Sequence, residues 1–217
     1  LYILQMAKVF VDKFALFFLP VYLFEIGAGW SAEGTLQAPA WLPVSIQALS
    51  EVQLGMGLVA LFFLLYRVAT AISSPFVGVL LHEYGNRLSM TVGYAFFAFG
   101  IVMLHLSTQI PSFIFVATIS FGIFMSFNHV TEFLILAQNT HKANVGKDIG
   151  LSRFLMQLAN MVAPLLGGLV IFYAGYQTLF LFGLFMLVAI LGITQTLTGK
   201  KETHAPVLSD VKILLKN

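Results

Sequence analysis

Six long apolar runs divide the chain into alternating apolar and polar stretches. Each run is about as long as the ~20 residues that a helix needs to cross a hydrocarbon layer of ~30 Å. The runs, numbered one to six in chain order, are Met6–Ile26, Leu54–Leu80, Ser89–Leu106, Phe113–Leu136, Leu151–Ala174 and Thr178–Thr196. The pattern therefore predicts an all-α membrane protein with six transmembrane helices.

The lysines and arginines between the runs all fall on one side of the predicted membrane. The segment Trp30–Gln53 carries Glu33 and Glu51 but no basic residue, and the turns at 108–111 and 173–177 carry no charge. Basic residues occupy the other turns and the tail: Arg87, Lys142, Lys147, Arg153, Lys200, Lys201, Lys212 and Lys216. Because basic loops stay in the cytoplasm, both termini are predicted to be cytoplasmic, and we expect a multi-pass protein of a prokaryotic inner membrane.

Composition points to the same class of protein. Hydrophobic residues make up 59% of the chain and charged residues 9%, against about 25% charged residues in a soluble domain. The first run carries charge near its start and no small-residue cleavage site follows it, so it does not read as a signal peptide. The absence of cysteine excludes disulfides, thiolate metal sites and cysteine nucleophiles. The net charge of +2 reflects topology, and we expect no nucleic-acid partner and no cofactor.

The ends of the chain suggest two domains and a fragment. Residues 1–199 form the predicted six-helix bundle, and residues 200–217 form a cytoplasmic linker. In this linker Val207, Val211 and Leu214 share one face at helical spacing, which predicts a short amphipathic helix on the inner membrane surface. The alternative is a disordered tail. Because the chain begins at Leu1 rather than at methionine, we expect a piece of a longer protein.

Polar side chains are concentrated in four of the six runs. They are Asp12 and Lys13 in the first, Arg67, Thr70 and Ser74 in the second, Asn128, His129, Thr131 and Glu132 in the fourth, and Arg153, Gln157 and Asn160 in the fifth, where Pro164 lies on the same face. Ionisable groups are costly in hydrocarbon, so they face a bundle interior or a wet cavity. Runs one, two, four and five are therefore predicted to line a central space, and runs three and six to face lipid.

The six runs follow the order polar, polar, apolar twice along the chain. This order predicts two three-helix inverted repeats, an arrangement common in transporters, whose binding sites lie near the bilayer midplane. The alternative is that the order arises by chance in a six-helix bundle. Gly93 and Gly100 share one face of the third run and predict close helix packing there.

The turn between the second and third runs resembles a motif of the major facilitator superfamily, Gly-x-Leu-x-Asp-Arg-x-Gly-Arg-Lys/Arg. Gly78, Leu80, Gly85 and Arg87 match it. In the family, the acidic residue of this motif helps to lock a cytoplasmic gate. Here His82 takes its position, and Glu83 supplies a charge one residue later.

The fifth run is similar to a second family signature, Gly-x8-Gly-x3-Gly-Pro-x2-Gly-Gly. The residues that correspond to it are Gly150, Ala159, Ala163, Pro164, Gly167 and Gly168. Pro164, Gly167 and Gly168 predict a bending, close-packed helix. An arginine that proton-linked members carry in the fourth helix is replaced by Thr118, which weakens the case for proton coupling by that route.

The resemblance covers the whole chain and implies a function. Members of the family usually have twelve helices in two halves, and this chain resembles the N-terminal half with the start of the linker. The resemblance implies a secondary active transporter, rather than an enzyme, that moves a small solute by alternating access. A second six-helix half and the lipid bilayer are the implied partners. The alternative is a six-helix scaffold or a homodimeric half-transporter.

Arg67 and Asp12 are the first candidate site residues. Arg67 lies near the middle of the second run, where a bare charge costs from ~3 to more than 10 kcal/mol. Its planar guanidinium suits a carboxylate or phosphate of a substrate. The alternative is an internal ion pair with Asp12 or Glu132.

The fourth and fifth runs supply the other candidates. Asn128, His129 and Glu132 lie close together in the fourth run, and a carboxylate near an imidazole can take up and release protons. The alternative is a polar cluster that only holds helices together. Gln157 and Asn160 are candidate hydrogen-bonding contacts to substrate or to neighbouring helices.

Two other kinds of site are not favoured. His129 and Glu132 alone cannot complete a metal site. An intramembrane hydrolase would need a nucleophile beside a base, and Ser126 with His129 is the pair that the fourth run offers. No glycine-rich nucleophile or oxyanion motif accompanies that pair.

Overall fold

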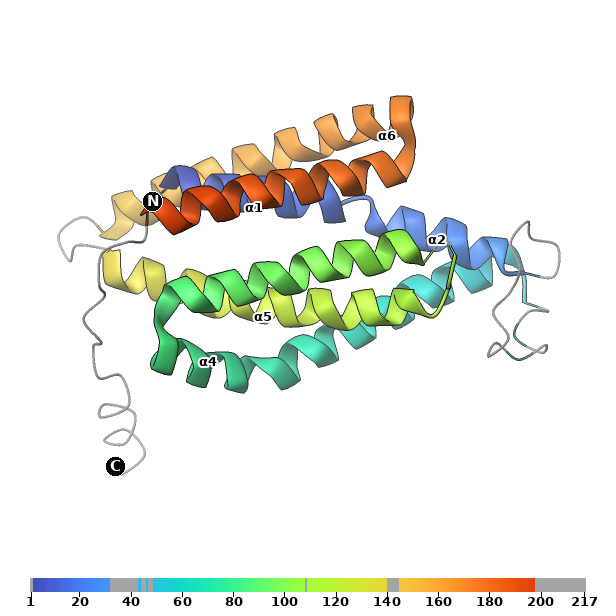
Figure 1. The fold of residues 1–217 in the computed structure, drawn as a ribbon. Helices are drawn as coiled ribbons and strands as arrows, with labels where there is room; N and C mark the ends of the chain where they lie inside the picture. Colours follow the sequence, from blue (N-terminus) through green and yellow to red (C-terminus); the bar gives the residue numbers. More distant parts are fainter. Residues whose placement is uncertain are drawn as a thin grey trace.

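The computed structural model describes residues 2–31, 43, 46, 49–107, 109–139 and 145–197. The main elements in these residues are all helices (Figure 1). They are α1 (Tyr2–Leu16), α2 (Leu19–Gly29), α4 (Glu51–Leu106), α5 (Phe113–Asn139) and α6 (Val145–Leu197). The predicted all-α class is confirmed, whereas the amphipathic helix predicted within 200–217 lies outside the described residues.

Two single glycines reverse the chain inside α4 and α6. Gly85 has φ 78° and ψ 174°, and Gly175 has φ 76° and ψ 173°. A positive φ of this size is readily adopted only by glycine. Each of the two helices is therefore a hairpin of antiparallel arms, 51–84 and 86–106 in α4 and 145–174 and 176–197 in α6 (Figure 1). We call them the first and second arms, and they correspond to runs two, three, five and six.

The first run forms two helices, where the sequence pattern predicted one. α1 and α2 follow one another end to end, with Phe17 and Phe18 between them (Figure 1). Pro20 lies in the first turn of α2. Because proline has no backbone N–H, it cannot donate to the carbonyl of Leu16 and continue α1. Hydrophobicity alone did not reveal this break, since the residues on both sides of it are apolar.

Four stretches of the described chain are long and apolar enough to cross a membrane. They are Glu51–Leu81, Leu88–Leu106, Phe113–Thr131 and Ile149–Gly192. The last of these contains the reversal at Gly175. α1 and α2, with 15 and 11 residues, are each shorter than the ~20 residues of a spanning helix. Six membrane crossings therefore stay a prediction.

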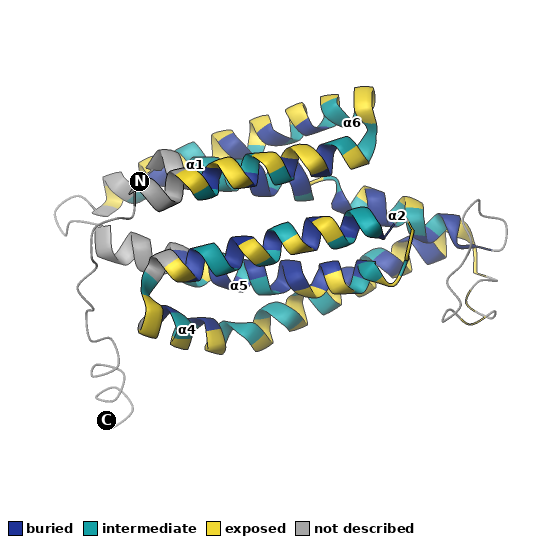
Figure 2. Cartoon of the chain, viewed as in Figure 1, coloured by how far each residue is buried: buried dark blue, intermediate teal, exposed yellow. Residues whose placement is uncertain are grey.

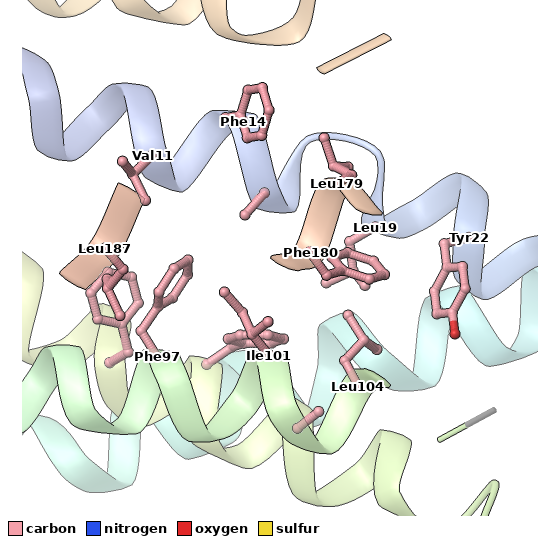
Figure 3. Close-up of a cluster of buried hydrophobic side chains, with 14 of the residues drawn as sticks. Val11, Phe14, Leu19, Tyr22, Phe97, Ile101, Leu104, Leu179, Phe180 and Leu187 are labelled. Carbon is pink, nitrogen blue, oxygen red and sulfur yellow. The ribbon is translucent and has the colours of Figure 1, made fainter. Parts of the chain in front are cut away.

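The core lies where the second arms meet the N-terminal helices. α4 packs mainly on α5, α1 on α6, and α2 on α4. Figure 3 shows part of the central cluster, in which α1 and α2 meet the second arms of α4 and α6. Labelled members are Val11, Phe14, Leu19, Tyr22, Phe97, Ile101, Leu104, Leu179, Phe180 and Leu187.

Within this chain, runs three and six do not stand outside the bundle as predicted, whereas their contact with lipid stays a prediction. Their residues, in the second arms of α4 and α6, supply much of the buried core. The first arm of α4 is instead the least buried of the four apolar stretches. Exposed residues occur along the whole of this arm and of the first arm of α6 (Figure 2). An apolar helix can be buried without leaving a polar group dry, so the apolar arms occupy the centre.

Small residues bring the helices into close contact. A Cβ atom at Gly93 would lie 2.7 Å from Cβ of Phe127, and one at Gly100 would lie 2.6 Å from the Phe121 ring. The predicted close packing at Gly93 and Gly100 is therefore confirmed, with α5 as the neighbour. Without a hydrophobic force between helices in lipid, such close approach supplies much of the packing energy.

A second close contact joins the first arm of α4 to α5. The hydroxyl of Thr70 donates to the carbonyl of Gly122 at 3.0 Å, and the hydroxyl of Ser126 donates to that of Ser74 at 3.0 Å. A Cβ atom at Gly122 would lie 2.6 Å from Cβ of Ala69. We call these five residues the polar seam.

Candidate functional site

A cavity of about 270 Å³ lies beside the break between α1 and α2. Its walls come from α1, α2, the first arm of α4 and α5. The lining residues are Asp12, Lys13, Leu16, Phe17, Leu19, Pro20, Phe62, Phe63, Tyr66, Arg67, Phe121 and Met125. Three of the four runs predicted to surround a central space therefore do so, and none of the described residues of runs three, five or six lines this cavity.

Three charged side chains meet in this cavity, which we call the charged cavity. Asp12 is buried, at 8% exposure, and its Oδ2 lies 3.4 Å from Nζ of Lys13. The guanidinium of Arg67 is exposed and lies 5.7 Å from the centre of the Tyr66 ring. No described carboxylate lies within ion-pair distance of Arg67.

The alternative in which Asp12 pairs with Arg67 is therefore wrong, because Lys13 takes that place. Sequence reasoning noted Lys13 but did not count it as a site residue. The signal was available, because two adjacent opposite charges lie in the middle of an apolar run. The side chain of Glu132 lies outside the described residues, so its pairing with Arg67 stays a prediction.

Aromatic rings form the apolar walls of the charged cavity. The Phe62 and Tyr66 rings stack with centroids 6.2 Å apart and an interplanar angle of 11°, and Phe63 stands edge-on to Phe62 at 5.7 Å. This stack is one helical turn long and ends beside Arg67. It places the guanidinium next to an apolar surface.

Asn128 lies in a different place, beside a small second cavity. That cavity has a volume of about 10 Å³ and is lined by Lys8, Tyr94, Asn128 and Thr131, among others. The volume is close to the ~10–15 Å³ that one water requires. Lys8 also approaches the Sδ atom of Met90 at 3.7 Å. Sequence reasoning missed this cluster because its members come from three separate runs.

His129 is exposed on α5, and neither it nor Asn128 lines the charged cavity. Their expected proton role together with Glu132 stays a prediction. The hydrolase alternative required Ser126 and His129 to form a nucleophile–base pair. Ser126 is instead buried at 1% exposure, and its hydroxyl donates to Ser74.

Gln157 and Asn160 lie on the first arm of α6. The Asn160 amide nitrogen donates to Oε1 of Gln157 at 3.3 Å, one turn away on the same helix. The carbonyl oxygen of Asn160 is buried and has no hydrogen-bond partner among the described atoms. Both amides lie outside the charged cavity, and their role as substrate contacts stays a prediction.

The gate motif is placed at the reversal between the arms of α4. Gly85 is the reversal itself, Leu80 is half-buried and Glu83 is exposed. A Cβ atom at Gly78 would meet nothing within 4 Å, so that glycine makes no close helix contact with the described residues. The side chain of Arg87 lies outside the described residues.

The predicted close packing of the fifth run is found next to Pro164. A Cβ atom at Gly167 would lie 3.1 Å from the Phe18 ring and 3.3 Å from the carbonyl oxygen of Phe14, and one at Gly168 would lie 3.4 Å from the Phe18 ring. The backbone stays helical through Pro164, since Gly175 is the non-helical point in α6. A bend at Pro164 therefore stays a prediction. In the described part of the chain, no three potential metal ligands gather.

Comparison with known proteins gives one match. The family model described as Major Facilitator Superfamily matches residues 1–212. No curated protein and no solved structure matches the chain. Members of this family are generally transporters rather than enzymes. The motif around Gly85 and the apolar helices agree with this match. The chain belongs to the Major Facilitator Superfamily and is an integral membrane protein, a transporter of the major facilitator kind.

Proposed function

We propose that this chain is the N-terminal half of a secondary active transporter, which moves a small solute by alternating access through the charged cavity. The observation that carries the proposal is the meeting of Asp12, Lys13 and Arg67 at one cavity from two separate helices. Charge deep in a membrane is costly and marks substrate or ion pathways. Arg67 is then the substrate anchor, with Asp12 and Lys13 as its charged neighbours.

Equivalent glycines support two inverted repeats. Gly85 and Gly175 have nearly the same dihedral angles. The same number of residues separates Gly78 from Gly168, Gly85 from Gly175, and Gly93 from Gly183. The first arms of α4 and α6 also run in opposite directions (Figure 1). Inverted repeats place a substrate site near the midplane and let one bundle rock against another.

The exposure of the first arms is an argument for a second six-helix half that packs against them. Large apolar side chains such as Phe76, Leu165 and Phe172, at 70–80% exposure, stand out from these arms. Lipid covers part of this surface, and a second six-helix half covers the rest and closes the charged cavity. A homodimer of this chain is the competing outcome, and the mass of the complex in mild detergent separates the two.

The orientation follows from the basic turns. α1 begins and α6 ends at the same end of the bundle, where α5 also ends and α6 begins (Figure 1). That end carries the reversal of α4, next to Arg87, and the start of α6, with Lys147 in its first turn. We infer that it faces the cytoplasm of a prokaryotic cell, in keeping with the positive-inside rule.

Cysteine labelling tests the transport proposal, because this chain has no cysteine. Met125→Cys in the complete protein puts a thiol in the charged cavity, and a membrane-impermeant maleimide is added to either side of sealed vesicles. We expect labelling from each side, because the cavity opens to both in turn. Val188→Cys, at an exposed apolar position outside the cavity, is the control that stays unlabelled. A Met125→Cys thiol sealed from both sides would contradict the proposal.

A further inference from the structure

The charged cavity contains one more positive than negative charge among its described side chains. Asp12 and Lys13 neutralise each other at 3.4 Å. Arg67 lines the same cavity, and its guanidinium lies over the Tyr66 ring. A guanidinium stays protonated under all ordinary conditions, so this surplus positive charge is permanent. Water can hydrate it when the cavity is empty, and an anion can neutralise it when a solute is bound.

Most of the remaining wall is apolar. It is formed by Leu16, Phe17, Phe62, Phe63, Phe121 and Met125. Phe17 and Phe63 are about half exposed, at 53% and 44%, so their rings are open to a bound molecule. The volume of about 270 Å³ lies just below the ~300–1,000 Å³ that is usual for drug-sized ligands. The cavity therefore fits a small molecule with an apolar body.

We propose that the solute is a small organic monoanion with an aromatic or similarly apolar body. This inference rests on the proposed function and names the class of its substrate. The guanidinium of Arg67 forms two parallel hydrogen bonds to the anionic group, as such groups do with carboxylates and phosphates. The apolar body lies against the Phe17 and Phe63 rings, whose burial supplies further binding energy.

Other charge types fit the cavity less well. A cation would add to the surplus positive charge. The ammonium group of a zwitterion would have to displace Lys13 from the buried carboxylate of Asp12, leaving Lys13 without its partner. A dianion would bring one negative charge that no described side chain of the cavity balances. A monoanion alone brings the described groups to neutrality.

A set of matched compounds tests the charge. Phenylacetate is the probe, with phenylacetamide, phenethylamine and phenylalanine as its neutral, cationic and zwitterionic counterparts. Calorimetry on the complete purified protein should give phenylacetate an affinity at least about ten-fold higher than each counterpart, a difference of ~1.4 kcal/mol. Equal or tighter binding of any counterpart would overturn the monoanion assignment.

Two further compounds test the other parts of the proposal. Acetate lacks the ring, so it should bind at least about ten-fold more weakly than phenylacetate, and equal binding would overturn the apolar body. Phenyl methyl phosphate carries the same single charge on a phosphodiester. Tighter binding of the phosphodiester assigns the anionic group to phosphate, and tighter binding of phenylacetate assigns it to carboxylate. Failure of both to bind would overturn the proposal.

Variants of Arg67 test the anchor. Arg67→Gln should weaken phenylacetate binding at least about ten-fold and leave phenylacetamide unchanged, and Arg67→Lys should restore part of the loss. Arg153→Gln is the control, because Arg153 is exposed on α6 and outside the cavity. If Arg67→Gln fails to fold, Phe63→Ala gives a second test, since it should weaken phenylacetate but not acetate. Unchanged phenylacetate binding in folded Arg67→Gln, or in Phe63→Ala, would overturn the proposal.

Exchange across proteoliposome membranes separates this inference from the function on which it rests. Phenylacetate that binds through Arg67 but never exchanges across the membrane would leave the cavity's ligand class standing and overturn the transport proposal. Exchange of phenethylamine or phenylalanine without phenylacetate binding would overturn the ligand class and leave the transport proposal standing. Arg67-dependent phenylacetate exchange supports both.

Discussion

The polar seam and the charged cavity share the first arm of α4 and α5, yet their polar groups are paired differently. In the polar seam the Thr70 hydroxyl bonds both to its own helix and to Gly122 of α5, and Ser126 bonds to Ser74. In the charged cavity, one helical turn from Thr70, no described carboxylate pairs with Arg67. Arg67, Thr70 and Ser74 nevertheless belong to the same set of polar positions in the second run.

The difference separates structure from function in this membrane protein. A polar group that finds a partner inside the bundle holds helices together, with a modest gain in lipid. A charge that finds none must be hydrated or bind a ligand. Changes to the seam should therefore act on folding, and changes to the cavity should act on transport. Four predictions test this division.

The largest effect is expected from Gly122→Leu in the seam. A Cβ atom there would lie 2.6 Å from Cβ of Ala69 and 2.7 Å from the carbonyl oxygen of Tyr66. Because that oxygen is backbone and cannot move aside, we expect a loss at or above the ~1–3 kcal/mol typical of overpacking. The measurement is the yield of monodisperse protein and its thermal midpoint.

Gly57→Leu is the matched control for that variant. Gly57 lies in the same arm of α4, and a Cβ atom there would meet nothing within 4 Å. We expect this variant to fold at least as well as the parent, because glycine is a poor helix former. Equal behaviour of the two leucine variants would show that the seam does not depend on close approach.

The second effect is expected from Arg67→Ala in the charged cavity. We expect the uptake rate to fall at least about ten-fold, equivalent to ~1.4 kcal/mol, while the thermal midpoint stays close to that of the parent. The reason is that Arg67 has no described ion-pair partner to lose. Uptake into proteoliposomes, corrected for the amount of folded protein, measures it. Unchanged uptake would remove Arg67 from the site.

The third effect is expected from Thr70→Val, which removes the hydroxyl that bonds to Gly122. Interhelical hydrogen bonds in membranes contribute on average ~0.6 and at most ~1.7 kcal/mol, so we expect a loss in that range with unchanged uptake. Ser73→Ala is the control, because the Ser73 hydroxyl bonds only to carbonyls of its own helix. A larger loss in Ser73→Ala than in Thr70→Val would break the comparison.

The smallest effect is expected from Tyr176→Phe, beyond both regions. The Tyr176 hydroxyl donates to Oε1 of Glu25 at 3.3 Å in an exposed position. Exposed substitutions usually change stability by less than ~0.5 kcal/mol, so the thermal midpoint should barely move. A loss as large as that of Thr70→Val would mean that this exposed contact holds α2 to the α6 hairpin.

Most of the fold was readable from local features of the chain. Apolar runs predicted five of the helical segments closely, because hydrophobicity is a property of each residue and needs no neighbour. The motif around Gly85 predicted a reversal and pointed to the family. The break at Phe17 and Phe18 was missed, although Pro20, with no N–H to donate, was its visible cause.

The candidate site was only partly readable. Asp12 and Arg67 were recognised because a charge stands out in an apolar run, and the two do line one cavity. The partner of Asp12 was not recognised, nor was the separation of Asn128 and Gln157 from that cavity. Such pairings depend on which helices touch, and a polarity pattern records only which helix carries a group.

The sequence by itself determined that this protein is helical, where its chain turns and which superfamily it belongs to. Contacts between distant segments decided that the second arms of α4 and α6 form the core, that Thr70 is bonded and that Arg67 opens into a cavity. The physical reason is the separation along the chain of the residues that each process involves. Helix formation and transfer into lipid depend on residues within a few turns, whereas packing and the pairing of buried polar groups depend on residues far apart in the chain.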